Sequence, residues 1–295
     1  MQPALLDRPV LRALLAGAER SLTQGPHPER ARRDAQALLL HVLKETAPGA
    51  NLSWLIAHQD DFAAPATAQS FRALIERRLA GEPIQYITTV AEFYGLSFHV
   101  DRSVLIPRPE TEHLIEKALA LAGNFTNPRI VDVGTGSGAI AIALAHNLPS
   151  AQFAATEISA PALTVAQSNA ARHALADRVR FFEGDLLLPV AGEQFDIVVS
   201  NPPYVPQADR DSLSVEVRDY EPSQALFAGD DGLTIYRRLI PAAFGALVPG
   251  GFVVLEIGYG QAGAVRALLN HAGFEAVEFT EDLQKIPRVA SAKRR

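Results

Sequence analysis

The sequence contains no cysteine, and only one methionine and one tryptophan, among its 295 residues. Without thiols, disulfide bonds and thiolate metal sites are excluded, and a reducing compartment is permitted. Positive charge is not in excess either, because 27 basic residues stand against 33 acidic ones and give a net charge of −6. This balance predicts no general attraction to nucleic acid or anionic lipid. The eight histidines show no paired ligand spacing, and we therefore predict no metal site.

A hydrophobic run long enough to cross a membrane is also missing. The longest uncharged apolar stretch, residues 239–255, is interrupted by Pro-Gly-Gly at 249–251, which predicts a helix, a turn and a strand. Residues 7–9, Asp-Arg-Pro, break the charged-then-apolar pattern of a signal sequence. We therefore expect a soluble, cytoplasmic protein without a membrane partner.

The spacing of apolar residues divides the chain into three segments. Residues 1–82 show helical periodicity without a strand signal, which predicts a small helical domain with helices from about residues 9, 28 and 66. Residues 83–110 alternate apolar and polar residues around Gly95 and then become proline-rich, which predicts a β-hairpin and a linker. Strands and helices alternate in residues 111–295, which predicts an α/β domain whose parallel sheet is covered by helices on both faces.

Short β-branched and aromatic runs in the last segment predict the strands of this sheet. They lie at residues 130–132, 153–156, 179–182, 197–200 and 252–256, with further extended segments at 276–279 and 289–292. Thr111 is a suitable N-cap for the helix that precedes the first strand. Two groups of basic residues are interpreted as solvated, namely the arginines at 30, 32, 33, 72, 77 and 78 and the tail at 293–295. A docking surface for a nucleoprotein or an acidic partner is the alternative for the arginines.

The first predicted strand leads into a turn with glycine at alternate positions. Glycine lets the backbone turn tightly and approach a ligand closely, although a tight turn without a ligand is the alternative. The spacing is neither the G-x-G-x-x-G of dinucleotide binders nor a P-loop, and it is not a nucleophile elbow. The turn consists of Gly134, Thr135, Gly136, Ser137 and Gly138.

Acidic residues follow the next two predicted strands. Glu157 lies about twenty residues past the turn, where α/β folds bind the two ribose hydroxyls of an adenosine. Asp185, followed by Leu186, ends the third strand and is placed to reach the adenine amino group, with a turn-capping aspartate as the alternative. A ribose-binding acid without a phosphate-binding lysine indicates an adenosine without a long phosphate tail. S-adenosylmethionine fits this description.

A stiff corner follows the strand at 197–200. Two consecutive prolines forbid the strand from continuing, since neither donates to a ladder. An amide, a free carbonyl and an aromatic ring are thereby held at the edge of the sheet where ligands bind in open α/β folds. The alternative is a proline-terminated turn with a surface tyrosine. The corner consists of Asn201, Pro202, Pro203 and Tyr204.

The glycine turn and this corner together resemble the class I S-adenosylmethionine-dependent methyltransferases that modify planar amino or amide nitrogens. The whole chain is similar to the bacterial protein-(glutamine-N5) methyltransferases that act on peptide chain release factors. Pro109 stands where the related enzymes for a ribosomal protein typically have serine, which favours release factors. Thr89 replaces the family's usual glycine, and Glu157 its commoner aspartate. Besides the two motifs, the resemblance covers residues 81–87, 93–95, 106–112, 216–218, 220–222, 231–233, 236–237 and 286–289.

The resemblance implies a Rossmann-like methyltransferase domain at 111–295, a helical substrate-recognition domain at 1–82 and a hairpin with linker at 83–110. It also implies a monomeric enzyme. The side-chain oxygen of Asn201 and the carbonyl of Pro202 would accept the N–H groups of a glutamine amide, and Tyr204 would stack on its plane. Pro203 completes the implied substrate site.

Other functions fit parts of the same pattern. A glutamine methyltransferase of a ribosomal protein would use the same chemistry. A nucleic-acid adenine-N6 methyltransferase would use the same corner after base flipping, but the acidic net charge and the lack of a basic-aromatic stripe disfavour it. The glycine spacing disfavours a nicotinamide oxidoreductase. A non-catalytic protein that binds partners through its helical domain is a further alternative.

Overall fold

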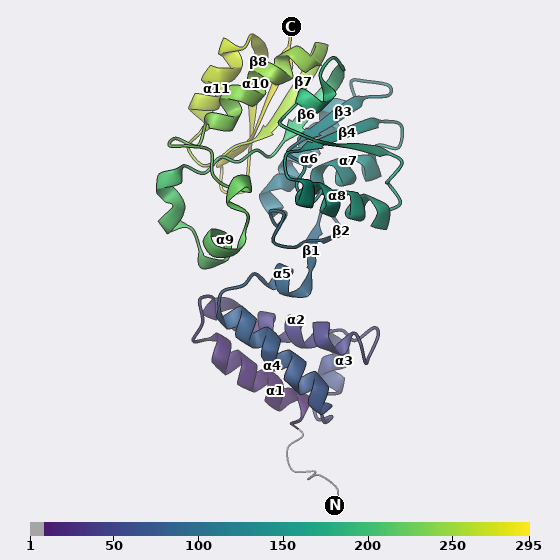
Figure 1. Ribbon diagram of the computed structural model, residues 1–295, viewed down its shortest axis with the longest axis vertical. Helices are drawn as coiled ribbons and strands as arrows, with labels where there is room; N and C mark the ends of the chain where they lie inside the picture. The colour runs from purple at the N-terminus through teal and green to yellow at the C-terminus, as the bar shows by residue number, and fades with distance from the viewer. Residues whose placement is uncertain (1–8) are drawn as a thin grey trace, which may run out of the picture. The chain divides into compact units, whose positions relative to one another are not determined.

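The computed structural model describes residues 9–295, and they form two compact units (Figure 1). One unit contains residues 9–89 together with Ser214–Tyr220, and the other contains Val90–Leu213 and Glu221–Arg295. A short segment from the second half of the chain therefore belongs to the N-terminal unit. The functional division into residues 1–82, 83–110 and 111–295 stays a prediction.

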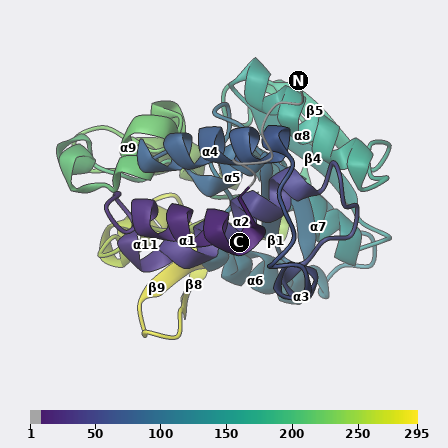
Figure 2. The ribbon, with the colours of Figure 1, turned by 90° about the horizontal axis from the view of Figure 1, so that it is seen from below.

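The N-terminal unit is entirely helical (Figure 2). The predicted helices beginning near residues 9, 28 and 66 are confirmed, although Pro9 lies just before the first helix and residues 1–8 lie outside the described chain. Two short helices, Leu52–Ala57 and Val215–Tyr220, were not expected, and residues 84–88 form a helix where alternation predicted a strand. The elements are α1 Leu11–Leu22, the 3-10 turn Pro28–Arg30, α2 Ala31–Leu43, α3 Leu52–Ala57, α4 Pro65–Leu79, α5 Ile84–Thr88 and α9 Val215–Tyr220.

Apolar stripes of α1, α2 and α4 form the core of this unit. Residues spaced by three or four positions lie on one helical face, so the leucines of α1 all point inward. They pack with Leu38 and Leu39 of α2 and Phe71 of α4, all of which are almost fully buried. The buried stripe of α1 consists of Leu11, Leu14, Ala18 and Leu22.

Thr89 ends α5 in a left-handed conformation with φ of 58°. Side chains with a branched Cβ are strained in this region, whereas glycine adopts it freely. The left-handed backbone therefore explains the family's usual glycine at this position, and threonine is the more strained residue there.

Arg78 is not solvated, contrary to the prediction for the basic residues. Its side chain is 2% exposed, and its Nε donates to Oδ2 of Asp34 at 2.6 Å. Its Nη1 lies 2.6 Å from Oε1 of Glu216 in α9 and donates to the carbonyl of Glu82 at 3.0 Å. A buried guanidinium needs such acidic partners because burial of an unpaired charge is very unfavourable. The segment around α9 is held in the helical unit by this pair.

We expect Arg78→Ala to destabilise the protein by about 3–5 kcal/mol, because it removes the cation that is paired with the buried carboxylate of Asp34 and the shortest ion pair of Glu216. Urea unfolding followed by circular dichroism measures the change. Arg72→Ala is the matched control, since Arg72 lies on the same helix and is exposed, and it should stay within about 0.5 kcal/mol of wild type. An equally small effect at Arg78 would contradict the role assigned to the buried pair.

The second unit is built on a seven-stranded sheet with the order β5-β4-β3-β6-β7-β9-β8 (Figure 1). All of the predicted strands of this sheet are confirmed, and β9 alone runs opposite to the other six strands. A separate hairpin pairs β1 Val90–Phe93 with β2 Leu96–His99, as the alternation around Gly95 predicted. The strands of the large sheet are β3 Arg129–Val133, β4 Gln152–Glu157, β5 Val179–Glu183, β6 Phe195–Ser200, β7 Leu247–Glu256, β8 Phe274–Glu281 and β9 Pro287–Arg294.

Helices cover both faces of the large sheet, as predicted (Figure 1). One face carries α6 Glu112–Ala122, α7 Ala139–Asn147 and α8 Ala160–Arg172, and the other carries α10 Thr234–Ala246 and α11 Ala262–His271. The remaining elements are 3-10 turns at Pro109–Thr111, Leu188–Val190, Gln207–Ser212 and Ser223–Ala225. Within residues 9–295, no helix combines the length and the apolar character that crossing a bilayer requires.

Two predictions about the last strands are wrong. The Pro-Gly-Gly segment at 249–251 is not a turn but lies inside β7, where the register with β6 shifts between Phe195 and Ile197. The basic tail is not a solvated end, because Lys293 and Arg294 belong to β9 and are half-buried. The guanidinium of Arg294 lies 5.0 Å from the ring centre of Phe244, so its charge rests on an aromatic face.

The order of the strands fixes the place of a ligand. The chain proceeds from β3 outward to β4 and β5, and then returns to the other side of β3 to form β6 and β7. Ligands of open α/β sheets bind at the carboxyl ends of the strands where this reversal occurs. The glycine turn follows β3 and the proline corner follows β6, so the two motifs meet at this point.

Candidate active site

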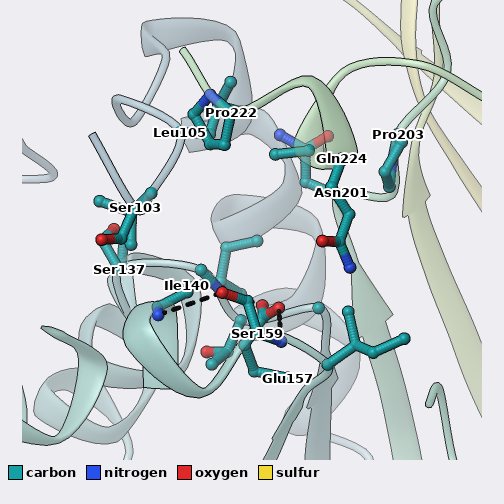
Figure 3. Close-up of a pocket in the computed structure, with 18 of the residues that line it drawn as sticks. Ser103, Leu105, Ser137, Ile140, Glu157, Ser159, Asn201, Pro203, Pro222 and Gln224 are labelled. Carbon is teal, nitrogen blue, oxygen red and sulfur yellow. Dashed lines mark hydrogen bonds between the residues drawn. The ribbon is translucent and has the colours of Figure 1, made fainter. Parts of the chain in front are cut away.

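A cavity of about 220 Å³ opens at this edge of the sheet (Figure 3). Its wall combines the glycine turn, the ends of β4 and β5, the proline corner and the linker before α6. The lining includes Phe93, Ser103, Leu105, Arg108, Thr111, Gly134, Thr135, Gly136, Ser137, Ile140, Glu157, Ser159, Asp185, Leu186, Asn201, Pro203, Pro222, Gln224 and Arg238.

The glycine turn is held tightly against β4. The backbone N–H groups of Gly134 and Thr135 both donate to the carbonyl of Thr156, at 2.8 and 3.0 Å. Gly138 has a φ of 83°, and a Cβ there would lie 2.9 Å from the side chain of Ile142. A side chain at this position would therefore be strained in its backbone and would crowd the side chain of Ile142 and Ala166 of α8. Of the predicted cofactor residues, Gly138 alone supports the cavity without lining it.

Asp132 supports the turn from the interior of the protein. Its Oδ2 accepts a hydrogen bond from Oγ1 of Thr135 at 2.5 Å and from the backbone N–H of Ala141 at 3.2 Å. The residue is 1% exposed, and this burial raises the pKa of its carboxyl group to about 7. The side chain thus joins the end of β3 to the turn and to the first turn of α7.

The raised pKa of Asp132 predicts a pH dependence of stability. In the unfolded chain its carboxyl group ionises near the usual aspartate pKa of 3.8, whereas in the folded protein it holds its proton up to about 7. Folding therefore takes up a proton between these pH values, and this contribution to the free energy of unfolding falls as pH rises, by up to about 1.4 kcal/mol per pH unit. Urea unfolding at a series of pH values should show a shallower decline in Asp132→Asn. The exposed control Asp177→Asn should keep the wild-type slope, and equal slopes in all three proteins would contradict the assignment.

Glu157 is 8% exposed and faces the glycine turn from the end of β4. Its Oε2 accepts from the backbone N–H of Gly136 at 2.9 Å, and its Oε1 accepts from that of Ser159 at 3.0 Å. A carboxylate offers about four lone-pair sites, so each oxygen has a further one beyond these bonds. Figure 3 shows Glu157 at the cavity wall, below the amide of Asn201. An acceptor for two hydroxyl groups is therefore present.

Asp185 and Leu186 also line the cavity, next to Glu157. The carboxylate of Asp185 is paired with Arg238 of α10, a partner that the sequence pattern did not indicate. Leu186 has a φ of 49°, which turns the chain away from the sheet directly after β5. Arg238 and Asp185 thus close this side of the cavity together.

The proline corner is anchored to the glycine turn through the residue before it. Oγ of Ser200 donates to the carbonyl of Val133 at 2.6 Å, across the boundary between β6 and β3. Asn201 and Pro203 line the cavity, and the amide of Asn201 points into it (Figure 3). Pro202 is buried and does not line it.

Tyr204 does not line the cavity either. Its ring packs against the core of the sheet, and its hydroxyl donates to Oε1 of Glu256 at 3.3 Å. Burial and the neighbouring carboxyl group of Glu256 raise the pKa of the phenol well above its usual value, so it stays a donor. The structure therefore brings Asn201 to the cavity and holds the ring of Tyr204 behind it.

Sequence reasoning did not identify Thr111 and Glu256 as site residues. Thr111 occupies the predicted N-cap position of α6, but its side chain makes no capping bond. Its hydroxyl instead donates to Oε2 of Glu256 at 2.5 Å, because the 3-10 turn at 109–111 points it toward the sheet. A glutamate that ends an otherwise apolar strand was the available signal for Glu256. Arg108 of the linker is paired with Glu221, and its Nη2 lies 2.6 Å from Oε2 of that carboxylate.

Two family models match the chain. The methyltransferase small domain model matches residues 111–217, and the PrmC N-terminal domain model matches residues 13–88. A protein of Moorella thermoacetica named release factor glutamine methyltransferase is 46% identical, over 89% of this chain and 90% of its own length. The protein of the same name from Geobacter sulfurreducens is 42% identical, over 90% of both chains.

A solved structure shows the same fold. The catalytic domain of hMettl16, crystallised with a MAT2A 3'UTR hairpin, superposes with a TM-score of 0.57 at 18% identity. The match covers 83% of this chain and 93% of that one. At this level of identity the likeness concerns the architecture alone, which is the α/β fold of class I methyltransferases.

Proposed function

The chain belongs to the family of release factor glutamine methyltransferases, and from this we propose that it transfers a methyl group from S-adenosylmethionine to the side-chain nitrogen N5 of a glutamine in a peptide chain release factor. One observation supports this proposal above all. The amide of Asn201 enters the same cavity as the glycine turn and Glu157, at the point where the strand order reverses. A nucleoside on one wall would thus face an amide-binding group on the other.

The proposed cofactor site follows from the cavity wall. The backbone of Gly134 to Gly138 would approach the methionine part, and Glu157 would accept the two ribose hydroxyls. Asp185 and Leu186 would contact the adenine. The acceptor of this wall fits an adenosine without phosphates, because the carboxylate of Glu157 would repel a phosphate group at the ribose.

The residues of the corner would bind and orient the amide that is methylated. An amide nitrogen is a poor nucleophile because its lone pair is delocalised into the carbonyl. Oδ1 of Asn201 and the carbonyl of Pro202 would accept its two N–H groups and favour a pyramidal nitrogen, and Tyr204, whose ring is held behind the corner, would support their position. These residues act by positioning and by electrostatic matching, since positive charge develops on the nitrogen as the bond to the methyl group forms.

When bound, S-adenosylmethionine supplies a methyl group made electrophilic by its sulfonium. The nitrogen lone pair would form the new N–C bond as the C–S bond breaks toward sulfur. Asn201 and Pro202 would hold the two N–H protons until one of them leaves to water. No side chain of the corner needs to remove a proton before transfer, which agrees with the absence of a strong base among the residues at 201–204.

The helical domain at 1–82 is proposed to recognise the protein substrate. Because a release factor takes part in translation, we place the reaction in the cytoplasm, without a membrane or nucleic-acid partner. We further propose that the enzyme acts as a monomer.

The test is a transfer assay with tritiated methyl donor. We expect label in a purified release factor and none in a ribosomal protein, RNA or DNA offered at the same concentration. Label in the ribosomal protein alone would show that the release factor is not the substrate. Label in nucleic acid alone would show that the enzyme does not methylate a glutamine amide. Glutamine replaced by alanine in the release factor should remove the signal.

A further inference from the structure

The carboxyl group of Glu256 lies behind the proposed methyl-transfer site without entering it. Glu256 ends β7, is 2% exposed and does not line the cavity. Its two oxygens accept from hydroxyl groups of other segments, Oε2 from Thr111 at 2.5 Å and Oε1 from Tyr204 at 3.3 Å. Its hydrogen-bonded connection to the cavity therefore runs through these neighbours.

The hydroxyl group of Thr111 links this carboxylate to Asn201 by hydrogen bonds. Nδ2 of Asn201 donates to Oγ1 of Thr111 at 3.2 Å. A hydroxyl group has one proton and two lone pairs. Because the proton of Thr111 is donated to Glu256, the oxygen of Thr111 can only accept from Asn201. The amide of Asn201 therefore directs its nitrogen toward Thr111 and its Oδ1 away from it.

We propose that Glu256 and Thr111 are positioning residues that set the orientation of the Asn201 amide, so that Oδ1 accepts an N–H of the amide to be methylated. This inference rests on the proposed function. The reversed orientation would present the NH₂ group of Asn201 to the NH₂ group of the substrate, which leaves two donors facing each other in a partly buried site. A series of hydrogen bonds thus connects Glu256 in the core of the sheet to the substrate amide through Thr111 and Asn201.

The protonation state of Glu256 determines the direction of the hydrogen bonds that connect it to Thr111 and Asn201. Burial is the main cause that raises the pKa of its carboxyl group to about 7. Ionised Glu256 can only accept from Thr111, whereas protonated Glu256 can also donate to it and release the Thr111 proton toward Asn201. We expect kcat to fall as pH decreases below about 7. The groups that act on the carboxyl are the hydroxyls of Thr111 and Tyr204 and the charges of Glu110 and Arg288, while the hydroxyl of Tyr236 donates to its backbone carbonyl at 2.7 Å.

Two substitutions of Thr111 separate orientation from packing. Thr111→Val keeps the shape but removes the hydroxyl group, and we expect kcat to fall about a hundred-fold while the dissociation constant of the cofactor stays unchanged. Thr111→Ser restores the hydroxyl and should recover most of this loss. The control Thr164→Val lies on the exposed face of α8 and should leave kcat unchanged. A Val variant with wild-type kcat, or a Ser variant as slow as the Val variant, would overturn the proposal.

The pH profile tests the part played by Glu256. The decline of kcat below pH 7 should be present in wild type and Thr111→Ser but absent from Thr111→Val, in which the link to Asn201 is broken. Glu256→Gln should also lower kcat, because Thr111 and Tyr204 donate to different oxygens of the carboxylate, and an amide places an NH₂ donor at one of these two positions. The same decline of kcat in Thr111→Val as in wild type would show that Glu256 does not act on Asn201 through Thr111.

A spectroscopic readout does not depend on which substrate is methylated. The side-chain NH₂ resonances of Asn201, assigned by their loss in Asn201→Ala, should shift in Thr111→Val protein without substrate. If they shift and the wild-type protein methylates no release factor, the proposed function fails while the orientation stands. If they do not shift, the orientation fails, whatever the substrate.

Discussion

Asn201→Ala is expected to lower kcat for methyl transfer by about a hundred- to a thousand-fold, the loss typical of removing one preorganised group at a reacting centre. The substitution removes the amide that enters the cavity opposite the glycine turn. The cofactor should still bind, because the bonds that hold the turn and Glu157 do not involve Asn201. Steady-state kinetics with a release factor measures kcat, and calorimetry measures the affinity for the cofactor.

Asn124→Ala is the matched control for this variant. Asn124 is exposed in the same unit, directly after α6, and its side chain donates only to the carbonyl of Leu121. It should leave both kcat and cofactor affinity unchanged. A parallel loss of cofactor affinity and activity in Asn201→Ala would contradict the separation of an amide-binding corner from a cofactor-binding wall.

Glu157→Gln should weaken cofactor binding by roughly ten- to a hundred-fold, which corresponds to one lost hydrogen bond with a charged acceptor. Both carboxylate oxygens already accept backbone N–H groups, and a glutamine offers only one acceptor oxygen. Its NH₂ group would face a backbone donor or displace a ribose hydroxyl. Calorimetric titration with S-adenosylmethionine gives the dissociation constant directly.

Glu183→Gln provides the comparison for Glu157. Glu183 pairs in register with Glu157 at the end of the neighbouring strand, but it is exposed and does not line the cavity. Its substitution should leave cofactor affinity at the wild-type value. An unchanged affinity in Glu157→Gln would show that the ribose is bound elsewhere, and Glu157 would then be a support of the turn only.

The strands of the sheet were predictable because burial on both faces requires continuous apolar runs, such as Ile197 to Val199 in β6. Short helices were not. Residues 84–88 alternate in a way that fits a strand or one helical turn equally, and the carbonyl of Pro83 decides for the helix by accepting from the N–H groups of Tyr86 and Ile87. α3 is too short to show a periodicity of its own.

Those site residues were predictable that belong to a short motif directly after a strand. The glycine turn, Glu157 and Asn201 each follow a strand, and parallel strands bring their carboxyl ends together. Pairs that form across the fold could not be predicted. Thr111 and Glu256 lie 145 positions apart, and neither shows its partner locally. The same holds for Arg78, whose burial depends on acids contributed by α2 and α9.

The central claim is that a glutamine amide of a release factor meets the methyl donor at Asn201. Mass spectrometry of a glutamine-containing release-factor peptide, fragmented after incubation with the enzyme and S-adenosylmethionine, tests it most directly. We predict one added methyl group on the glutamine side-chain nitrogen with wild-type enzyme and with Asn124→Ala, and at most about a hundredth of this product with Asn201→Ala in the initial phase of the reaction. A methyl group on another residue, or an unmodified peptide alongside a methylated nucleic acid, would contradict it.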